Sequence, residues 1–524
     1  MQETFYITTP IYYPNDKLHI GHTYTTIAAD SMARYKKLRG YDVKFLTGMD
    51  EHGQKIERSS AERGKTPQEQ VDEIAALTKK LWETLEVDFD FFWRTTDPQH
   101  QEIAKKMFTR LYEQGDIYKG EYSGMYCTPC ESFFSDRQLE GDKCPDCGRA
   151  CEAIAEEAYF FRLSKYQDQL IAHIEANPEF IYPKSRASEM LNNFLKPGLT
   201  DLCVSRTSFT WGIPVEFDPR HVMYVWIDAL SNYITALGYS TDHDEMFRKY
   251  WPADIHLVGK DIVRFHSIIW PAILMALGLP LPKQIYGHGF LVIDGKRMGK
   301  SLGNAIEPLF LVNRYGVDAI RYFLMREISF GQDGNFTFEA LVSRINADLA
   351  NDLGNLLSRT VGMIDKYFGG KLPETKLATD FDEDLIATVK LALPKIENSM
   401  DNLVFSDALN EIWNIIRRSN KYVDEVEPWK LVKDPQKTEI LAACLYNLAE
   451  VLRIVAILIS PVLVKTPEII FEQLCISDPQ HKTWDSCHSF GLLPCNVQIK
   501  KGDIVFPRLD IQKETESLTE ITGG

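Results

Sequence analysis

Two histidines stand three residues apart near the start of the chain, in the run His19-Ile20-Gly21-His22. Residues 10–17 are rich in Pro, Asn and Asp, and a helical pattern follows over residues 22–38, so the run lies where a loop becomes a helix. Helix N-termini bind phosphate, and a glycine there lets a nucleotide approach the backbone. The run therefore predicts a phosphate site, although histidines at this spacing also serve as packing or capping residues.

A second cationic element occupies residues 295–301 and follows a predicted strand at 290–293. It contains three cations, Lys296, Arg297 and Lys300, together with two glycines. It resembles a P-loop but has only three residues between its first glycine and Gly299-Lys300-Ser301, where a P-loop has four. A cationic loop that reaches a polyphosphate is the preferred interpretation. A solvated charged hairpin is the alternative.

Four cysteines form two Cys-x-x-Cys pairs, Cys127 with Cys130 and Cys144 with Cys147. Two such pairs present four thiolates tetrahedrally to one Zn²⁺. Because no coordination position stays open, we expect a structural metal rather than a catalytic one. Cys151 lacks a paired neighbour and is interpreted as a spare thiol; unmetallated cysteines are the alternative for the whole group.

A Rossmann-like parallel sheet is expected to position the two phosphate elements, because strands and helices alternate and ligands bind at the carboxyl ends of parallel strands. The predicted strands and helices are, in order, residues 5–9, 22–38, 43–47, 67–85, 99–114, 222–226, 255–258, 263–277 and 284–287. Between residues 120 and 151 the chain changes to short segments with Gly, Pro and Cys. The fold class is therefore α/β, with a catalytic domain split by a zinc-binding insert.

The chain turns helical from about residue 338. Long segments with apolar residues every three or four positions cover residues 339–367, 381–399, 406–423 and 438–460. This periodicity is typical of packed bundle helices. An all-α bundle is therefore expected after the α/β domain.

The chain has 524 residues, of which 44% are hydrophobic and 25% charged. These shares are those of soluble globular proteins, and the length predicts about three or four domains, so a disordered chain and a single small module are excluded. The 58 Lys and Arg against 74 Asp and Glu give a formal net charge of −16, the wrong sign for a protein that coats nucleic acid. A polyanionic partner must meet a local basic patch.

No secretory signal is visible in residues 1–10, and the longest uncharged run, residues 265–282, contains His266 and three prolines. That run is expected to be a buried helix and a turn, so no membrane partner is predicted. Ten cysteines without a signal indicate a reducing compartment. The expected location is the cytoplasm.

Together these motifs resemble the methionyl-tRNA synthetase family of the class I aminoacyl-tRNA synthetases. Residues 19–22 match the HIGH signature completely, and residues 297–301 match the KMSKS loop, with Arg297 in place of its first lysine and Gly299 in place of its first serine. The other matching stretches are residues 9–15, 47–53, 225–229, 259–262 and 265–267. The resemblance extends from about residue 4 to residue 470.

The resemblance implies ATP-dependent ligation of L-methionine to tRNA(Met) through methionyl-adenylate, with release of AMP and pyrophosphate and with Mg²⁺ accompanying ATP. It implies catalytic roles for His19, His22, Arg297 and Lys300, and ATP binding by Gly21, Gly259, Asp261 and Lys300. The implied methionine pocket contains Ile11, Tyr13, Asp50, Trp226, Ala229, Leu230, Tyr233, Ile262, His266 and Trp270. Asp50 would bind the substrate ammonium; the implied anticodon residues are Asn355, Arg359 and Trp429, and the implied structural Zn²⁺ ligands are Cys127, Cys130, Cys144 and Cys147.

The expected parts of the chain follow the same boundaries. They are a first catalytic half (1–118), a connective insert with the zinc knuckle (119–221), a second catalytic half ending in the KMSKS-like loop (222–325), a stem-contact junction (326–365), a helical anticodon-binding domain (366–470) and a tail (471–524). Many members of the family carry a further C-terminal domain that binds tRNA and forms dimers. This sequence ends soon after residues 506–508, without room for such a domain, so a monomer is expected.

Two other classes of protein share some of these features. A nucleotidylyltransferase also carries a HIGH-like site, but it needs neither the helical bundle nor the zinc insert. A zinc-bearing RNA-binding protein or scaffold explains the cysteines and the bundle, but leaves the phosphate motifs without a use.

Overall fold

A computed structural model of the chain describes residues 2–127, 132–134, 139, 141, 143–145, 148–224, 226–293, 295–297, 306–374, 379, 381–514 and 516. Its catalytic region is built on a six-stranded sheet with the order β3-β2-β1-β11-β12-β7, and every neighbouring pair is parallel. The strands are β1 (Thr4–Tyr12), β2 (Asp42–Met49), β3 (Phe91–Arg94), β7 (Ile181–Tyr182), β11 (Ile255–Gly259) and β12 (Gln284–His288). The predicted α/β class is confirmed.

The sheet is covered on both faces, as parallel sheets usually are. Phe5 and Ile7 of β1 pack into one hydrophobic core, and Tyr6 between them packs into the other, because side chains alternate along a strand. The covering helices and the short helices that follow them are α1 (Ile20–Leu38), α2 (Gln54–Glu62), α3 (Pro67–Thr84), α4 (Pro98–Glu113), α7 (Trp226–Thr235), α8 (Glu245–Tyr250), η3 (Lys260–Ile262), η4 (Phe265–Ile269), α9 (Trp270–Leu277), α10 (Pro308–Tyr315) and α11 (Val317–Glu327).

The strand order reverses its direction of growth at β1, since β2 lies on one side of β1 and β11 on the other. Such a switch point opens a crevice at the carboxyl ends of the strands. β1 ends at Tyr12 and β11 ends at Gly259, so the loops that follow these two strands face the same crevice.

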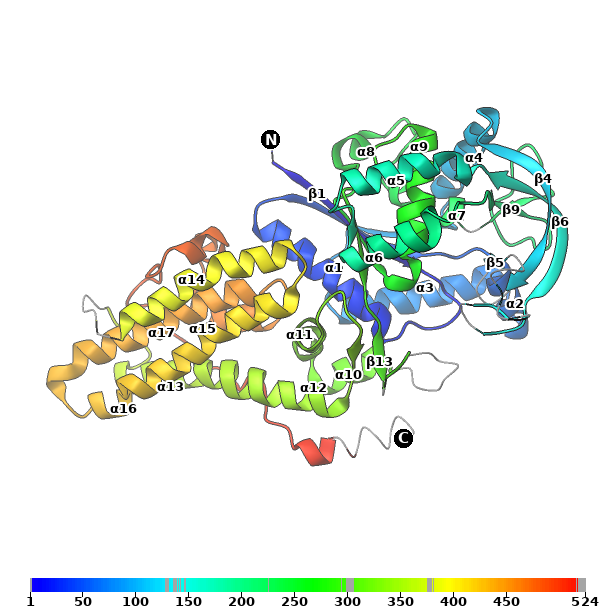
Figure 1. Cartoon of the computed structure of the whole chain (residues 1–524). Coiled ribbons are helices and arrows are strands. Elements are labelled where there is room, and N and C mark those ends of the chain that lie inside the picture. Colours follow the sequence, from blue (N-terminus) through cyan, green and yellow to red (C-terminus); the bar gives the residue numbers. More distant parts are fainter. Residues whose placement is uncertain are drawn as a thin grey trace.

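The connective insert forms its own antiparallel sheet, which lies at the far end of the molecule from the helical bundle (Figure 1). Its strands are β4 (Ile117–Cys127), β5 (Ser132–Phe134), β6 (Glu152–Phe161) and β8 (Leu202–Cys203), and a separate antiparallel pair is β9 (Ser205–Arg206) with β10 (Val222–Met223). The helices that follow β6 and β7 are η1 (Leu163–Tyr166), α5 (Gln167–Ala176), α6 (Lys184–Glu189) and η2 (Met190–Leu195).

The prediction of a strand at residues 222–226 is wrong in two respects. Only Val222 and Met223 are extended, and they pair with β9 instead of joining the parallel sheet. Trp226 already begins α7. The run is apolar and aromatic, and a short apolar run does not distinguish a strand from a buried helix start. The edge of the parallel sheet beside β12 is formed instead by β7, which comes from the region after the cysteines in sequence.

The chain from α12 onward forms an elongated helical bundle, as predicted (Figure 1). Its helices are α12 (Phe338–Arg344), η6 (Ile345–Gly354), α13 (Asn355–Phe368), α14 (Asp382–Asp401), α15 (Phe405–Val426), α16 (Pro428–Leu431), η7 (Pro435–Lys437), α17 (Thr438–Ile459), α18 (Thr466–Gln473), η8 (Pro479–Lys482) and η9 (Asp485–His488). A small sheet of β14 (Lys296–Arg297), β13 (Leu291–Ile293) and β15 (Gly334–Asn335) lies between the parallel sheet and the bundle in sequence.

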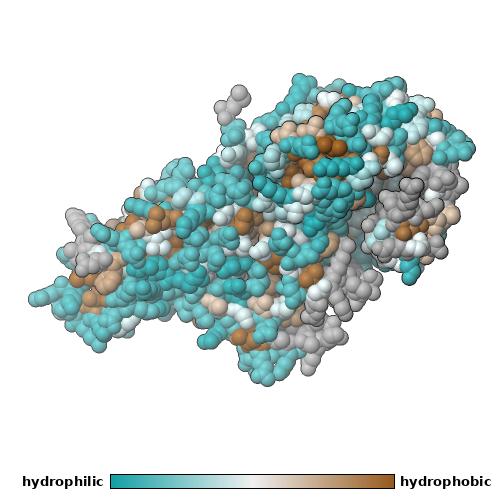
Figure 2. Space-filling model, viewed as in Figure 1, coloured by the Kyte–Doolittle hydropathy of each residue, from teal (hydrophilic) through white to brown (hydrophobic). Residues whose placement is uncertain are grey.

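Pro435–Ile459 is long and apolar enough to cross a membrane, but 94% of its most apolar window is buried inside the protein. It is the central helix of the bundle, and a core helix passes the same length and composition test. The face of the molecule drawn in Figure 2 is mostly hydrophilic, with small separated hydrophobic patches.

A buried ion pair between two helices of the catalytic region is bonded to the chain that follows α17 of the bundle. The guanidinium of Arg321, on α11, contacts the carboxylate of Asp30, on α1, and also donates to the backbone oxygens of Val462 (2.7 Å) and Leu85 (3.1 Å). Both charged side chains are fully buried. The same hydrophobic core extends from Ile7 of the sheet to Leu452 of α17.

Candidate active site

A cavity of about 400 Å³ opens at the carboxyl ends of β1, β2, β11 and β12. It brings together most of the residues that sequence analysis selected from widely separated motifs. The predicted residues that line it are Ile11, Tyr13, His19, Gly21, His22, Asp50, Trp226, Ala229, Leu230, Tyr233, Gly259, Asp261, Ile262 and His266. The start of α1, where a phosphate site was predicted, and an apolar wall thus share one cavity.

The two histidines cap the start of α1. The Nδ1 atom of His19 accepts from the Gly21 N–H, and the Nδ1 atom of His22 accepts from the His19 N–H, both at 3.1 Å. An accepting Nδ1 places the proton of a neutral imidazole on Nε2. The capping bonds therefore fix the tautomer that offers Nε2–H donors to an anion, so capping and phosphate binding are compatible roles.

Two glycines keep the nucleotide side of the cavity open. A Cβ atom on Gly21 would lie 2.9 Å from Cε1 of His19, and a Cβ on Gly259 would lie 2.7 Å from Oδ1 of Asp261. Either methyl group would push away a side chain that lines the cavity.

The apolar wall comes mainly from α7 and from the segment after β11. Trp226 stacks on Phe265, with ring centroids 3.7 Å apart, and Ala229, Leu230 and Tyr233 follow on the same helix. These residues give the cavity an aromatic and aliphatic lining of the kind that accommodates a flexible thioether.

His266 is held neutral on this wall. Its Nδ1 donates to the Ile262 backbone oxygen (2.9 Å), and its Nε2 accepts from the Tyr233 hydroxyl (2.7 Å). Burial lowers the pKa of His266 to about 4, and burial raises the pKa of Tyr233. At neutral pH the pair therefore presents no charge to an apolar ligand.

Asp50 directly follows β2. It is the one acidic residue of the predicted methionine pocket, and it lines the cavity together with the apolar wall. Its backbone N–H donates to the Tyr12 oxygen (2.9 Å), which fixes the chain where β1 and β2 end. A carboxylate in this position suits a substrate ammonium group.

Trp270 does not line the cavity. It is completely buried behind Tyr233, at 6.1 Å between ring centroids, and its indole N–H donates to Nε2 of His256 (3.3 Å). Trp270 thus supports the wall from behind in this structure.

Several residues of the cavity were missed by sequence analysis, among them Asn15, Lys55 and His288. Lys55 brings the only Lys or Arg side chain among the described residues of the lining, and its ammonium lies 5.3 Å from the Tyr13 ring centroid. His288 ends β12 and its Nε2 lies 2.7 Å from the Thr25 hydroxyl. Its place at the carboxyl end of a parallel strand was the available signal.

The KMSKS-like loop lies largely outside the described residues, and Lys300 is among those not described. The backbone of Arg297 belongs to β14 and pairs with Val292. Where the description resumes, the Ile306 oxygen accepts from the Ile20 N–H of α1 (3.2 Å). The segment after the loop is thus attached to the start of the HIGH helix.

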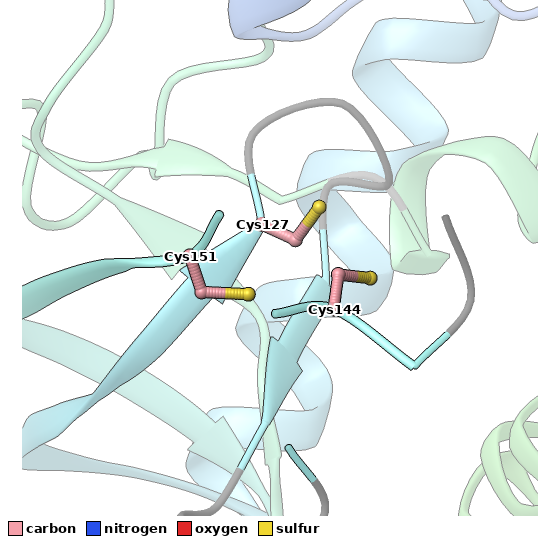
Figure 3. A group of neighbouring side chains, drawn as sticks. All are labelled: Cys127, Cys144 and Cys151. Atoms are coloured by element: carbon pink, nitrogen blue, oxygen red, sulfur yellow. The ribbon is translucent and has the colours of Figure 1, made fainter. Parts of the chain in front are cut away.

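Three buried cysteines converge in the insert, Cys127, Cys144 and Cys151, with sulfur atoms within 4.8 Å of one another (Figure 3). Soft thiolates gathered in this way suit Zn²⁺. Cys130 and Cys147 lie outside the described residues. Cys151, which was interpreted from the sequence as a spare thiol because it has no paired neighbour, thus lies within the cluster.

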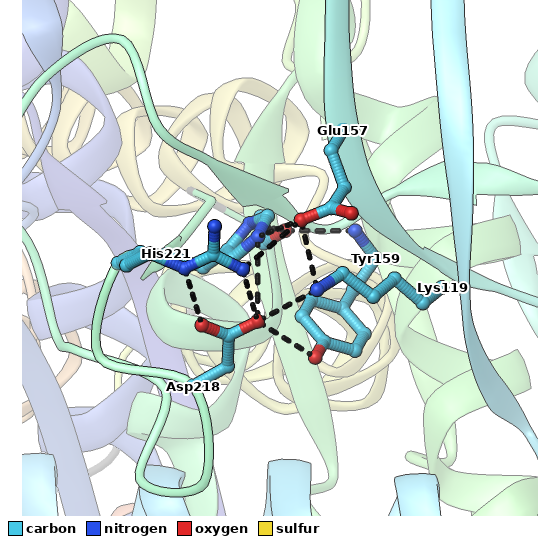
Figure 4. A network of polar contacts seen from close by, with 7 residues as sticks. Lys119, Glu157, Tyr159, Asp218 and His221 are labelled. Carbon is cyan, nitrogen blue, oxygen red and sulfur yellow. Dashed lines mark hydrogen bonds and ion pairs between the residues drawn. The ribbon is translucent and has the colours of Figure 1, made fainter.

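A second group of possible metal ligands, Glu157, Asp218 and His221, is already neutralised by protein cations (Figure 4). The ammonium of Lys119 lies 2.8 Å from both carboxylates, and Arg220 contacts them as well. The group is an ion-pair network that joins β4 and β6 to the loop before β10.

The three predicted anticodon residues lie close together on the bundle. Asn355 and Arg359 are one turn apart on α13, and the Arg359 guanidinium lies 5.9 Å from the ring of Trp429, which is 39% exposed. Arg359 also pairs with Asp424 at 3.0 Å.

Comparison with known proteins identifies the family. The family model described as tRNA synthetases class I (M) matches residues 5–157 and 147–361, and the model of the anticodon binding domain of methionyl tRNA ligase matches residues 372–523. The chain belongs to the methionyl-tRNA synthetase family. It is an enzyme of the class I aminoacyl-tRNA synthetases.

Similar proteins support this membership over the whole chain. The Methionine--tRNA ligase of Caldanaerobacter subterraneus subsp. tengcongensis is 61% identical over 522 residues, which cover 100% of this chain and 81% of that protein. The Methionine--tRNA ligase of Bacillus subtilis is 54% identical, over 98% of this chain and 79% of its own length. A solved methionyl-tRNA synthetase of Mycobacterium tuberculosis in complex with methionyl-adenylate has a TM-score of 0.93 and 41% identity, and covers 97% of this chain and 100% of that one.

Membership in the methionyl-tRNA synthetase family accounts for the geometry of the cavity. An aminoacyl-tRNA synthetase must hold a nucleotide and an amino acid together, and here the HIGH helix and the apolar wall face one space. The nucleotidylyltransferase and scaffold alternatives are therefore excluded.

Proposed function

We propose that this enzyme activates L-methionine with ATP to give methionyl-adenylate and pyrophosphate, and then transfers methionine to tRNA(Met) with release of AMP. The observation that carries the proposal is the single cavity in which His19 and His22, Asp50 and the α7 wall meet. A nucleotide triphosphate and a small amphipathic amino acid can occupy its two sides together.

The first step needs no general base, because the methionine carboxylate is already ionised at neutral pH. Catalysis then consists of positioning and of stabilising the charge that moves onto pyrophosphate. His19 and His22 are proposed to donate from Nε2 to ATP phosphates. Gly21 and the segment of Gly259 and Asp261 bind the remainder of the nucleotide, with Asp261 on the ribose.

The KMSKS-like loop supplies further positive charge in this proposal. Lys300 and Arg297 are assigned to the pyrophosphate, with Lys300 as the principal transition-state residue. The link between Ile306 and Ile20 supports the assignment, because it attaches the end of this loop to the start of α1.

Methionine recognition is assigned to both ends of the apolar pocket. Asp50 binds the ammonium, and Ile11, Tyr13, Trp226, Ala229, Leu230, Tyr233, Ile262 and His266 surround the side chain, with Trp270 behind them. An apolar pocket discriminates by only about 1–3 kcal/mol per methylene, so the aromatic walls must fit the thioether closely. The neutral Tyr233–His266 pair supports this role, since it lets the wall accept an uncharged sulfur.

The bundle is proposed to read the anticodon through Asn355, Arg359 and Trp429. An exposed indole stacks on an unpaired base, and an amide or guanidinium reads its edge. The closeness of Arg359 to the partly exposed Trp429 supports a joint binding surface.

A structural Zn²⁺ is proposed for the insert. Cys127 and Cys144, with Cys130 and Cys147, would hold it, and the metal would supply rigidity and no chemistry of the reaction. The convergence of Cys127 and Cys144 supports this site. Mg²⁺ enters with ATP as the counter-ion of its phosphates, and no protein ligand is assigned to it.

Amino-acid-dependent ATP–pyrophosphate exchange tests the proposal. Among all standard amino acids, methionine alone should support exchange. Exchange with a different amino acid would move the assignment to another synthetase specificity, and no exchange with any amino acid would refute it. The monomeric state and the cytoplasmic location are proposed with it; light scattering on the purified enzyme measures the first and cell fractionation the second.

A further inference from the structure

A completely buried carboxylate lies on the helix that forms the apolar wall of the cavity. Asp228 is the third residue of α7 and is 0% exposed. Its Oδ2 lies 2.7 Å from Nδ1 of His52, and its Oδ1 lies 2.8 Å from Nε2 of His100. Both histidines are themselves buried. None of the three is among the described residues that line the cavity.

The directions of these hydrogen bonds follow from the chemistry of the carboxylate. An ionised carboxylate only accepts, so Nδ1 of His52 and Nε2 of His100 both carry protons. On the far side of His100, Nδ1 lies 2.8 Å from the hydroxyl of Thr235, which accepts from the indole N–H of Trp93 (3.0 Å). Burial alone would raise the pKa of Asp228, but the two imidazoles lower it to about 2.

The carboxylate connects the two ends of the amino-acid pocket. On its own helix it sits between Trp226 and Ala229, which form the apolar wall. Through His52 it reaches the turn that contains Asp50, two residues earlier. That turn is fixed by other bonds as well, since the Gly53 N–H donates to the Trp211 oxygen at 3.0 Å.

We propose that Asp228 is a positioning residue for methionine, which sets the distance between the α7 wall and the ammonium-binding Asp50 through His52, with His100 orienting it from behind. The inference rests on the proposed function. It assigns to this buried network a role in amino-acid affinity, because the carboxylate of Asp228 bonds a histidine next to the Asp50 turn and a histidine of α4 to the helix of the apolar wall. The nucleotide side of the cavity, built from α1 and the end of β11, is independent of it.

The isosteric variant Asp228→Asn tests the proposal. It keeps the shape but replaces the charged carboxylate by an amide, and the imidazole that faces the new NH₂ group must move its proton to the other ring nitrogen to accept from it. A charge-assisted hydrogen bond is thereby replaced by a weaker neutral one, which loosens the connection between the turn and the helix. In methionine-dependent ATP–pyrophosphate exchange, the KM for methionine should rise about 10- to 100-fold, as for a small misplacement of binding groups. The KM for ATP should stay unchanged, and kcat should change by less than about threefold.

Two further variants keep the test independent of folding problems at Asp228. His100→Gln retains an N–H at the position of Nε2 and should leave the KM for methionine near that of the unaltered enzyme, whereas His100→Leu removes the donor and should raise it. Asp218→Asn is the matched control, because it alters a paired carboxylate of the insert, and it should leave this KM unchanged.

The possible outcomes distinguish a failure of the proposed function from a failure of the positioning role of Asp228. If the unaltered enzyme shows no methionine-dependent exchange, the proposed function fails. If the enzyme responds but Asp228→Asn and His100→Leu keep its KM for methionine, the positioning role is refuted. A loss of active sites by adenylate titration with an unchanged KM would also refute it, because that is the signature of a merely structural role.

Discussion

The capping of α1 by its own histidines has a consequence for how phosphate is bound. Each Nδ1 is engaged by a backbone N–H, so the orientation of each ring and the position of its proton are set before ATP arrives. Because these donors are already oriented, little free energy is needed to reorganise them when phosphate binds. Stabilisation of charge in a transition state depends on such preorganised donors.

A methyl group on Gly21 tests this arrangement. Gly21→Ala would place a Cβ atom 2.9 Å from Cε1 of His19 and should turn that imidazole away. We expect adenylate formation to fall about tenfold or more, on the scale of a disturbed electrostatic contact. Single-turnover formation of methionyl-adenylate measures this; Gly362→Ala, where a Cβ meets nothing within 4 Å, is the control and should have no effect.

Removal of the loop lysine should have a larger effect than the glycine change. Lys300→Ala is expected to lower the rate of adenylate formation about 10²- to 10³-fold, because it deletes a positive charge proposed to act in the transition state. ATP–pyrophosphate exchange near the rate of the unaltered enzyme would contradict the assignment. Lys513→Ala, an exposed lysine of the C-terminal segment, should leave the rate unchanged.

At the scale of elements, substitutions in the proposed anticodon surface or in the proposed zinc site should affect one property of the enzyme and leave another unchanged. α13 and α16, which carry the proposed anticodon residues, are far from the cavity residues along the chain, and these helices lie at the end of the molecule away from α7 in Figure 1.

Trp429→Ala should lower kcat/KM for tRNA(Met) about 10-fold or more, since base stacking contributes roughly 1–3 kcal/mol. ATP–pyrophosphate exchange should not change, because the substituted side chain is remote from methionine and ATP. Val432→Ala, another exposed apolar residue of the same region, is the matched control. Equal aminoacylation efficiency in the Trp429 variant would remove Trp429 from the binding surface.

The cysteines of the insert allow a direct measurement of metal content. Cys127→Ser should abolish zinc binding by the purified enzyme, and Cys203→Ser, outside the cluster, should retain about one zinc per chain. Cys151→Ser should retain it as well if the two Cys-x-x-Cys pairs are the ligands. Loss of zinc from the Cys151 variant, or retention of zinc by the Cys127 variant, would contradict the proposed ligand set.

The elements that sequence analysis predicted well are those with a strong periodic or motif signal. α1, α3, α4, α15 and α17 follow their apolar repeats, and the HIGH run marks a helix start because its own side chains make the cap. Residues 222–226 were misassigned because β10 and the start of α7 are both apolar. The ties among Asp228, His52 and His100 join positions more than 100 residues apart, and no local pattern reports such contacts.

At the scale of the whole molecule, buried histidines link stability to pH. Burial lowers the pKa values of His256, His266 and His288, and that of His266 falls from 6.5 to about 4. Between these pH values the unfolded chain binds protons that the folded enzyme does not, so the free energy of unfolding should fall as the pH drops from about 7 to 4.5. His266 alone contributes about 2 kcal/mol to this change.

Denaturant unfolding at several pH values measures the effect. His266→Gln, whose amide can take the place of Nε2 beside Tyr233, should flatten the pH dependence. The comparison variant is His481→Gln, on a short helix that contains no buried residue. A free energy of unfolding that is constant between pH 7 and 5 would contradict the assigned burial effect.

Arg321 is bonded both to Asp30 of α1 and to the Val462 oxygen beyond α17, and one hydrophobic core runs through both regions. We therefore expect the separation between Trp429 and the cavity to vary little. If Trp429 contacts the anticodon as proposed, a tRNA is selected by its dimensions as well as by its bases, because its anticodon and its terminal adenosine must span this separation.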